Sequence, residues 1–291
     1  MAGRDGHAPE DDGGGERPGW LSAWCLLVEQ VAGADPGRRR FGARHHQYRT
    51  APPLTAARLA ALEAELGLAL PADYRDYLGL VGDGGAGPYA GLAPFDHPAQ
   101  RPGLRGVHDP TTSTGPWAGV VALGAVGCDQ ATYLVVRGAD AGTVWLDARA
   151  AGAGVRPIAP SFAAYLADWG RDLARGEWPR SWAPPGACAL PRALSAYLAG
   201  RERALGVAAG TLGDAELRRE LAAIPAGAIR LVAAGAGPMY ADGDLVDPCP
   251  ACEHLLAGLA GRGLDRAALA PATTPRLAVA TSGPDGPGID R

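Results

Sequence analysis

The sequence contains no lysine, so all 27 of its basic side chains are arginines. They are set against 31 acidic residues, which leaves a formal net charge of −4. Proteins that bind nucleic acid usually carry a basic excess, so this balance argues against a nucleic-acid partner. The missing lysine also excludes a Walker-type phosphate loop, whose chemistry depends on that side chain.

Long apolar runs are missing too, because no segment reaches the roughly 20 residues that a membrane-spanning helix needs. The first apolar stretch follows Asp11 and Asp12 rather than a basic segment, which is not the pattern of a secretory signal peptide. The five cysteines are mostly scattered, unlike the framework of a disulfide-rich secreted domain. We therefore expect a cytoplasmic protein with no membrane partner. The sequence indicates no particular oligomeric state.

Signatures of catalysis are also absent. The nucleophile motif G-x-S-x-G does not occur. No histidine or cysteine is followed two residues later by the glutamate that zinc-dependent nucleotide deaminases use to move protons. The sequence therefore predicts no catalytic residues, no cofactor-binding residues and a protein that is not an enzyme.

The strongest structural pattern begins at Leu54. Thr55 is placed to cap a helix of leucines at helical spacing, and Gly67 suits the left-handed residue that ends it. Pro71 then opens a second helix, which a glycine-rich turn stops at Gly82.

Further along, the period changes to short β-branched runs at 120–123, 132–136, 143–146 and 155–158. A helix capped by Ser161 and ended by Gly176 follows them. Helices first, sheet next and helix last predict an α+β fold, with an antiparallel sheet of about four to six strands and helices on one face. Downstream, helical and short strand patterns predict a small mixed α/β C-terminal extension, with brief strands at 229–233 and 239–241.

An ordered series of these motifs resembles the SUKH superfamily, which contains fungal cell-wall-assembly regulators and many bacterial immunity proteins. The residues that carry the resemblance lie in the helices, the glycine-rich turn and the strands: Leu70, Pro71, Tyr74, Gly82, Gly84, Gly87, Pro88, Trp145, Phe162 and Leu166. The resemblance implies a protein-binding domain without catalysis. For the bacterial branch it implies an immunity protein that binds and neutralises a cognate toxin domain.

On this basis we divide the chain into six segments. They are a disordered lead (1–19), an N-terminal helix and linker (20–53), a SUKH-like domain (54–176), a proline-rich linker (177–187), the C-terminal extension (188–270) and a disordered tail (271–291). Arginines 38–40 and the pair His45-His46 fall in the first linker, where we expect a solvated charge cluster.

The turn from Gly82 to Gly87 matches the spacing G-x-G-x-x-G of dinucleotide-binding loops. That mechanism needs a strand before the loop and a helix after it, so that a pyrophosphate meets a helix N-terminus. Here a helix precedes the loop and Pro88-Tyr89 follows it. The context therefore argues against nucleotide binding.

The best chemical candidate is the pair Cys249 and Cys252, at the start of a predicted helix. Two sulfurs at this spacing can bind one zinc ion or form a redox pair, and the spacing also resembles half of a deaminase zinc site. Zinc usually needs four ligands, and only Cys188 and His254 stand out as further contributors. A third interpretation is structural, with two small, partly buried thiols at a helix start.

For partner recognition we expect an exposed face of the sheet and its adjoining loops, chiefly 82–92 and 96–118, because loops on a rigid scaffold often carry recognition. Aromatic side chains that could line a partner groove are Tyr89, Phe95, Trp117 and Trp145, although such residues more often belong to the core.

Overall fold

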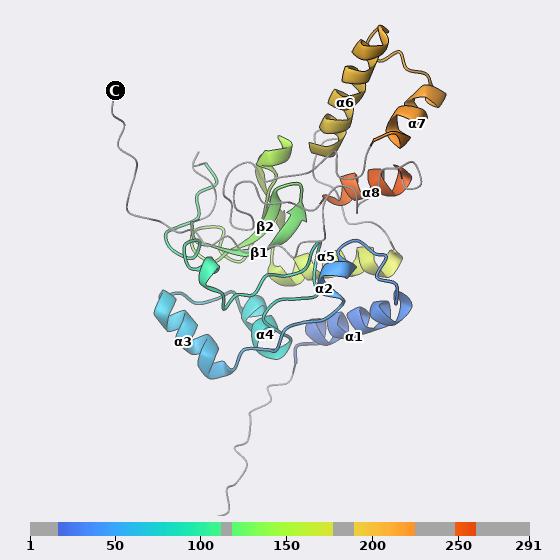
Figure 1. Cartoon of the computed structure of the whole chain (residues 1–291). Coiled ribbons are helices and arrows are strands. Elements are labelled where there is room, and N and C mark those ends of the chain that lie inside the picture. Colours follow the sequence, from blue (N-terminus) through green and yellow to red (C-terminus); the bar gives the residue numbers. More distant parts are fainter. Residues whose placement is uncertain (1–16, 112–117, 177–188, 225–247, 260–291) are drawn as a thin grey trace, which may run out of the picture.

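The computed structural model describes residues 17–111, 118–176, 189–224 and 248–259. These residues form eight α-helices and one four-stranded antiparallel sheet (Figure 1), which confirms the α+β fold class. The helices are α1 (Gly19–Ala34), α2 (Ala43–His46), α3 (Ala56–Leu66), α4 (Ala72–Leu80), α5 (Phe162–Arg175), α6 (Ala189–Leu205), α7 (Asp214–Ala222) and α8 (Pro250–Leu259). In the described part of the chain, no helix is both long enough and apolar enough to cross a membrane.

The sheet is a simple meander in which each strand pairs with the next along the chain. Its strands are β1 (Val120–Gly127), β2 (Gln130–Val135), β3 (Val144–Asp147) and β4 (Val155–Ala159). Only Cys128 and Asp129 connect β1 to β2, and Gly127 pairs directly with Gln130. Both turn residues have positive φ, 52° and 59°, as the tight type I′ hairpin turn requires.

The local signals for the helix ends are confirmed. The Thr55 side chain accepts a hydrogen bond from the Arg58 backbone N–H at 3.2 Å, and Gly67 ends α3 in the left-handed conformation. Ser161 caps α5 in the same way through the N–H of Ala164, and Gly176 ends that helix. These interactions involve residues three positions apart, so the sequence pattern alone places them well.

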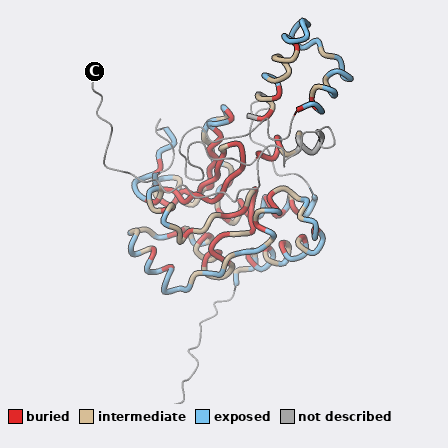
Figure 2. The backbone as a smooth tube through the Cα atoms, in the orientation of Figure 1, coloured by how far each residue is buried: buried red, intermediate tan, exposed pale blue. Residues whose placement is uncertain are grey.

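One hydrophobic core fills the space between the sheet and helices α1, α3, α4 and α5. Trp24 of α1 packs edge-on against Tyr77 of α4 and lies 6.1 Å, centroid to centroid, from Trp169 of α5. Helix α1 therefore belongs to the same core as the SUKH-like segment predicted at 54–176. Figure 2 shows this buried interior running through the middle of the molecule.

A second hydrophobic core lies on the other face of the sheet, beneath α6, α7 and α8. It joins small sheet residues to the ends of these helices: Ala122, Ala125, Cys128, Ala131, Leu190, Leu194, Leu221, Ile224, Cys249 and Cys252. The distal ends of α6 and α7 project from the body and are largely exposed (Figures 1 and 2). The described C-terminal extension is helical, and the predicted strands at 229–233 and 239–241 lie outside the described residues.

The expectation of an exposed sheet face is wrong for β1, β2 and β3, whereas β4 is partly exposed. Every position of β1, β2 and β3 is buried, including the side chains that point away from α5. Part of that face is covered by the helices of the C-terminal extension. Strands β1, β2 and β3 therefore offer no open surface.

The glycine-rich turn is also not an open recognition loop, because most of residues 82–92 are buried. The segment after it lies along the free edge of β1, where Ala93 N–H donates to Leu123 C=O at 2.6 Å. A side chain at Gly124 would collide with the Gly91 carbonyl, which explains why the sequence is so rich in glycine here. The turn covers an edge strand and supports the fold.

Candidate functional site

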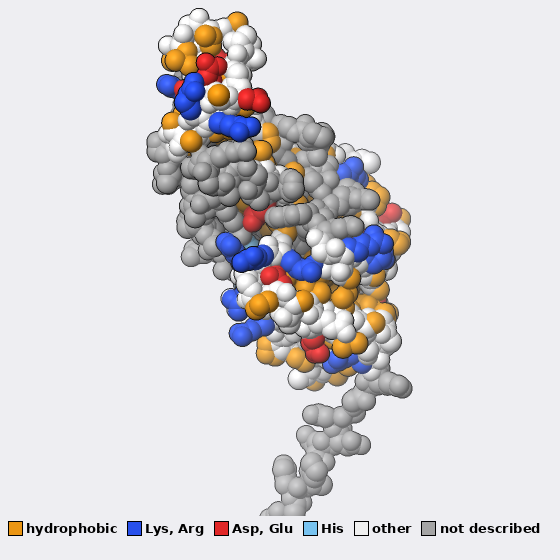
Figure 3. Space-filling view, turned by 90° about the vertical axis from the view of Figure 1, so that its right-hand side faces the viewer, with side chains coloured by type: hydrophobic (Ala, Val, Ile, Leu, Met, Phe, Trp, Pro, Cys, Tyr) orange, Lys and Arg blue, Asp and Glu red, His pale blue; other side chains and the backbone are white. Residues whose placement is uncertain are grey.

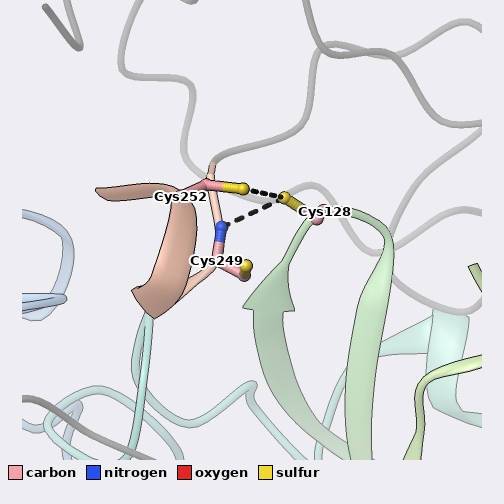
Figure 4. Close-up of side chains that lie close together, drawn as sticks. All are labelled: Cys128, Cys249 and Cys252. Carbon is pink, nitrogen blue, oxygen red and sulfur yellow. Dashed lines mark hydrogen bonds between the residues drawn. The ribbon is translucent and has the colours of Figure 1, made fainter. Parts of the chain in front are cut away.

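Three cysteine side chains converge where α8 meets the β1–β2 hairpin (Figure 4). The Sγ atoms of Cys128, Cys249 and Cys252 all lie within 4.8 Å of one another. The Cys128 and Cys252 sulfurs are 3.5 Å apart and point toward each other. All three residues are buried, at 5%, 1% and 0% relative exposure.

The backbone around Cys128 is built for this approach. Gly127 has φ 102°, and a Cβ there would lie 2.5 Å from the Pro248 carbonyl oxygen, so only glycine lets residues 248–249 come this close. Cys128 itself adopts a left-handed conformation, which is uncommon for a residue other than glycine. The N–H of Cys249 then donates a hydrogen bond to the Cys128 sulfur at 3.3 Å.

The arrangement suits a thiophilic metal ion. Two sulfurs bound to one tetrahedral zinc at about 2.3 Å lie roughly 3.8 Å apart. The observed separations, from 3.5 Å to at most 4.8 Å, are near that value. A disulfide between Cys128 and Cys252 would instead need an S–S distance of about 2.05 Å. The same cluster can therefore hold a metal ion or, after a small movement, form a disulfide.

The sequence singled out Cys249 and Cys252 but missed Cys128, which is the third member of the cluster. Cys128 is 121 residues away from Cys249 along the chain, and no local spacing links them. The sequence offered one signal for Cys128: it occupies a two-residue hairpin turn, a position where Asn-Gly or Asp-Gly is usual. Cys188 lies outside the described residues, and the side chain of His254 is not described.

A second candidate site is the exposed loop at residues 105–111, between the 3₁₀ helix Pro98–Gln100 and β1. Two backbone hydrogen bonds hold it in place: Gly119 N–H donates to Arg105 C=O, and His108 N–H donates to Arg137 C=O, both at 3.0 Å. The buried His108 ring packs 4.8 Å, centroid to centroid, from Trp145. Burial lowers the pKa of His108, although the Asp140 carboxylate opposes the shift. The loop is thus exposed at its tip and anchored at its base.

The residues that carried the family resemblance support the fold. Leu70, Tyr74, Phe162 and Leu166 belong to the first core, and Trp145 is buried beside Tyr133 on the opposite face of the sheet. Four members of the turn, Gly82, Gly84, Gly87 and Pro88, are buried, and a side chain at any of the three glycines would collide with neighbouring atoms. Pro71 precedes the first residue of α4. Of the candidate groove aromatics, Tyr89 and Phe95 are buried and Trp117 lies outside the described residues.

Two acidic residues join separate parts of the chain. Asp73 accepts a hydrogen bond from the N–H of Ala163 in the first turn of α5 at 2.8 Å. Asp83 accepts from the N–H of Phe95 at 2.5 Å, and burial raises the pKa of its carboxyl. Both carboxylates thus satisfy backbone donors, which gives them a structural role.

His46 also departs from the predicted solvated cluster. It is 7% exposed, its ring packs against Trp169, and its Nδ1 accepts the N–H of Tyr48 at 3.0 Å. Burial, with a smaller effect of neighbouring His45, lowers the pKa of His46 to about 4.

Comparison with known proteins identifies the middle of the chain. Residues 53–168 match the model of the SMI1 / KNR4 family (SUKH-1). These residues form a domain of the SUKH superfamily. The matched segment contains Cys128 and the loop at 105–111, whereas Cys249 and Cys252 lie beyond it. Neither the curated proteins nor the solved structures gave a match.

Proposed function

We propose that this protein is a non-enzymatic protein-binding module of the immunity type, whose SUKH domain binds a cognate toxin domain and neutralises it. The observation that carries the proposal is the SUKH-1 match over residues 53–168, because many members of this superfamily are bacterial immunity proteins. The fungal members are regulators of cell-wall assembly, so partner binding is the function that both branches imply. The cytoplasmic location expected from the sequence stays a prediction.

The loop at 105–111 is the part of the domain best suited to contact the partner. Its exposed residues include Arg105 and Val107, and Val107 is 64% exposed, the highest value among the large hydrophobic residues in the described part of the chain. Asp109 shapes the tip by accepting hydrogen bonds from the N–H and hydroxyl of Thr111 at 2.9 and 2.6 Å. A preformed loop loses little conformational entropy on binding, which favours affinity.

On the side of the molecule shown in Figure 3, charge does not mark out a single binding patch. Figure 3 shows arginine side chains spread among hydrophobic and acidic ones on one side of the molecule, without a continuous field of one sign. Specific recognition then depends on a few well-packed anchors, for which arginine and large apolar side chains are the usual choice.

The proposal is tested by co-expressing the full chain with a panel of candidate toxin domains in a host that each toxin kills. Rescue of growth, together with a complex that co-purifies at 1:1 stoichiometry, supports toxin neutralisation. Binding without rescue indicates a scaffold or regulator and contradicts the immunity role. Failure to capture or neutralise any toxin in a panel that covers the domains paired with SUKH proteins would overturn the proposal.

Two valines provide a matched pair for locating the surface. Val107→Asp should weaken toxin binding about tenfold or more, because it places a charge at the centre of the proposed contact. Val207→Asp, at a valine that is 42% exposed just after α6, should leave the affinity unchanged. Isothermal titration calorimetry measures both, and circular dichroism checks that each variant is folded. Equal affinities for the two variants would remove the 105–111 loop from the interface.

A further inference from the structure

We propose that Cys128, Cys249 and Cys252 bind one zinc ion, which fastens the C-terminal helix α8 to the β1–β2 hairpin of the SUKH domain. The proposal is independent of toxin binding, since it concerns a different part of the molecule. The three sulfurs come from both sides of the second core, one from a hairpin turn and two from the start of a helix (Figure 4).

The three sulfur atoms would have to move only slightly to bind one zinc ion. The Cys128 and Cys252 sulfurs, at 3.5 Å, are slightly closer than two ligands of one zinc. The other separations are within 4.8 Å, so they need to close by at most about 1 Å. Three thiolates and one further ligand complete the tetrahedral coordination that structural zinc sites adopt. Cys249 immediately precedes α8 and Cys252 lies in its first turn, the spacing that turns both sulfurs toward one point.

The charges at the site are compatible with a bound cation, since without one the buried thiols would stay protonated and neutral. Zinc binds cysteine as thiolate, so each ligand gives up its proton on binding. Three buried thiolates without a cation would be very costly to desolvate, whereas Zn²⁺ offsets two of their three negative charges. The positive end of the α8 dipole and the N–H of Cys249 stabilise the remaining negative charge.

The backbone conformation at Gly127 and Cys128 also favours close contact between the β1–β2 hairpin and residues 248–249. Cys128 adopts a left-handed conformation although it is not a glycine. A side chain at position 127 would collide with the backbone of residues 248–249. Both features bring the Cys128 sulfur to the Cys249 N–H. On the sheet side, only the small side chains of Ala122, Ala125 and Ala131 accompany Cys128 in this core.

Zinc fits this set better than other ions. Thiolates select soft or borderline metals and disfavour magnesium, calcium and manganese, which prefer oxygen ligands. Zinc has no redox chemistry of its own, and a closed, buried thiolate site is the usual form of a structural zinc centre.

The test uses the full chain, purified under reducing conditions without chelators. Elemental analysis should find about one zinc per chain, and X-ray absorption of the wild-type protein should find sulfur scatterers at about 2.3 Å. Cobalt added to metal-depleted protein should give the thiolate-to-cobalt charge-transfer band and the strong visible bands of a tetrahedral site. These measurements need no variant, so they stand even if a substitution prevents folding.

Substitutions then assign the ligands. Cys128→Ser, Cys249→Ser and Cys252→Ser should each lower zinc occupancy at least tenfold at limiting metal, since each removes a thiolate ligand. Cys25→Ser is the matched control, because Cys25 lies in α1 and packs against the other core. It should keep full occupancy.

Three results would overturn the proposal. One is wild-type protein that neither contains zinc nor binds added zinc or cobalt. Another is a Cys128–Cys252 disulfide in place of metal, seen by mass spectrometry of the reduced and non-reduced protein. The last is undiminished zinc in the three serine variants.

Discussion

The two hydrophobic cores on either side of the sheet are built from different residues. The core under α1, α4 and α5 contains large side chains, with Phe162 packed edge-on against both Tyr74 and Tyr77. The core under α6–α8 meets the sheet through alanines and cysteines. Because burial free energy scales with apolar area, the described members of the second core, which are fewer and on the sheet side smaller, should contribute less to stability than those of the first.

The difference in side-chain size between the two cores bears on the three clustered cysteines, which all lie in the second core. Small domains with too little buried area often depend on a disulfide or a metal ion. The second core has that character, and it contains the only cluster of three metal-ligating side chains found among the described residues. The proposed zinc ion would thus add a second kind of stabilisation, on the face of the sheet opposite the first core.

The largest expected effect comes from truncating the first core. Phe162→Ala should reduce the free energy of unfolding by about 3–5 kcal/mol, because it leaves a cavity among fully buried rings. Leu194→Ala, in the second core, should cost only about 2 kcal/mol, because the ends of α6 and α7 can close around a smaller side chain. Urea unfolding followed by circular dichroism measures both. A loss from Leu194→Ala equal to that from Phe162→Ala would mean that the two cores are equivalent.

Lowering the pH should reduce the free energy of unfolding, because the neutral ring of His46 packs against Trp169 of the first core. Its folded pKa of about 4 lies below the ordinary value of 6.5, so the unfolded chain takes up a proton first as the pH falls. The stability that depends on the neutral ring is complete above about pH 6.5 and is lost between there and about pH 4, by up to roughly 3 kcal/mol.

His46→Asn removes this titration and is the variant to compare. Its free energy of unfolding should fall less steeply than that of the wild type across the same pH range, measured by urea unfolding at several pH values. Parallel curves for the two proteins would show that another group is responsible.

The contact between hairpin and extension can be broken at Gly127. Gly127→Ala places a Cβ against the Pro248 carbonyl and also pays the cost of a positive φ, together about 2–3 kcal/mol. Gly142→Ala has a similar φ of 97° but open space around its Cβ, so it should cost only the conformational part, about 1 kcal/mol. The difference between the two unfolding free energies isolates the clash. No difference would show that residues 248–249 do not press on the hairpin.

The sequence predicted the parts of the fold that are decided locally. Caps at Thr55 and Ser161 and helix ends at Gly67 and Gly176 depend on residues a few positions away, and the strands follow their own β-branched runs. Burial of β1, β2 and β3 on both faces could not be predicted in this way, because it depends in part on helices that lie far away in the sequence. The position of Cys128 beside Cys249 is a long-range contact of the same kind.

Hydrogen–deuterium exchange of the full chain, with and without a zinc chelator, tests the contrast between the two cores most directly. Chelation should make exchange faster at residues 127–130 and in the first turns of α8, with no change in α3, α4 and α5. Exchange that is unchanged everywhere, or that rises equally in both cores, would contradict that contrast.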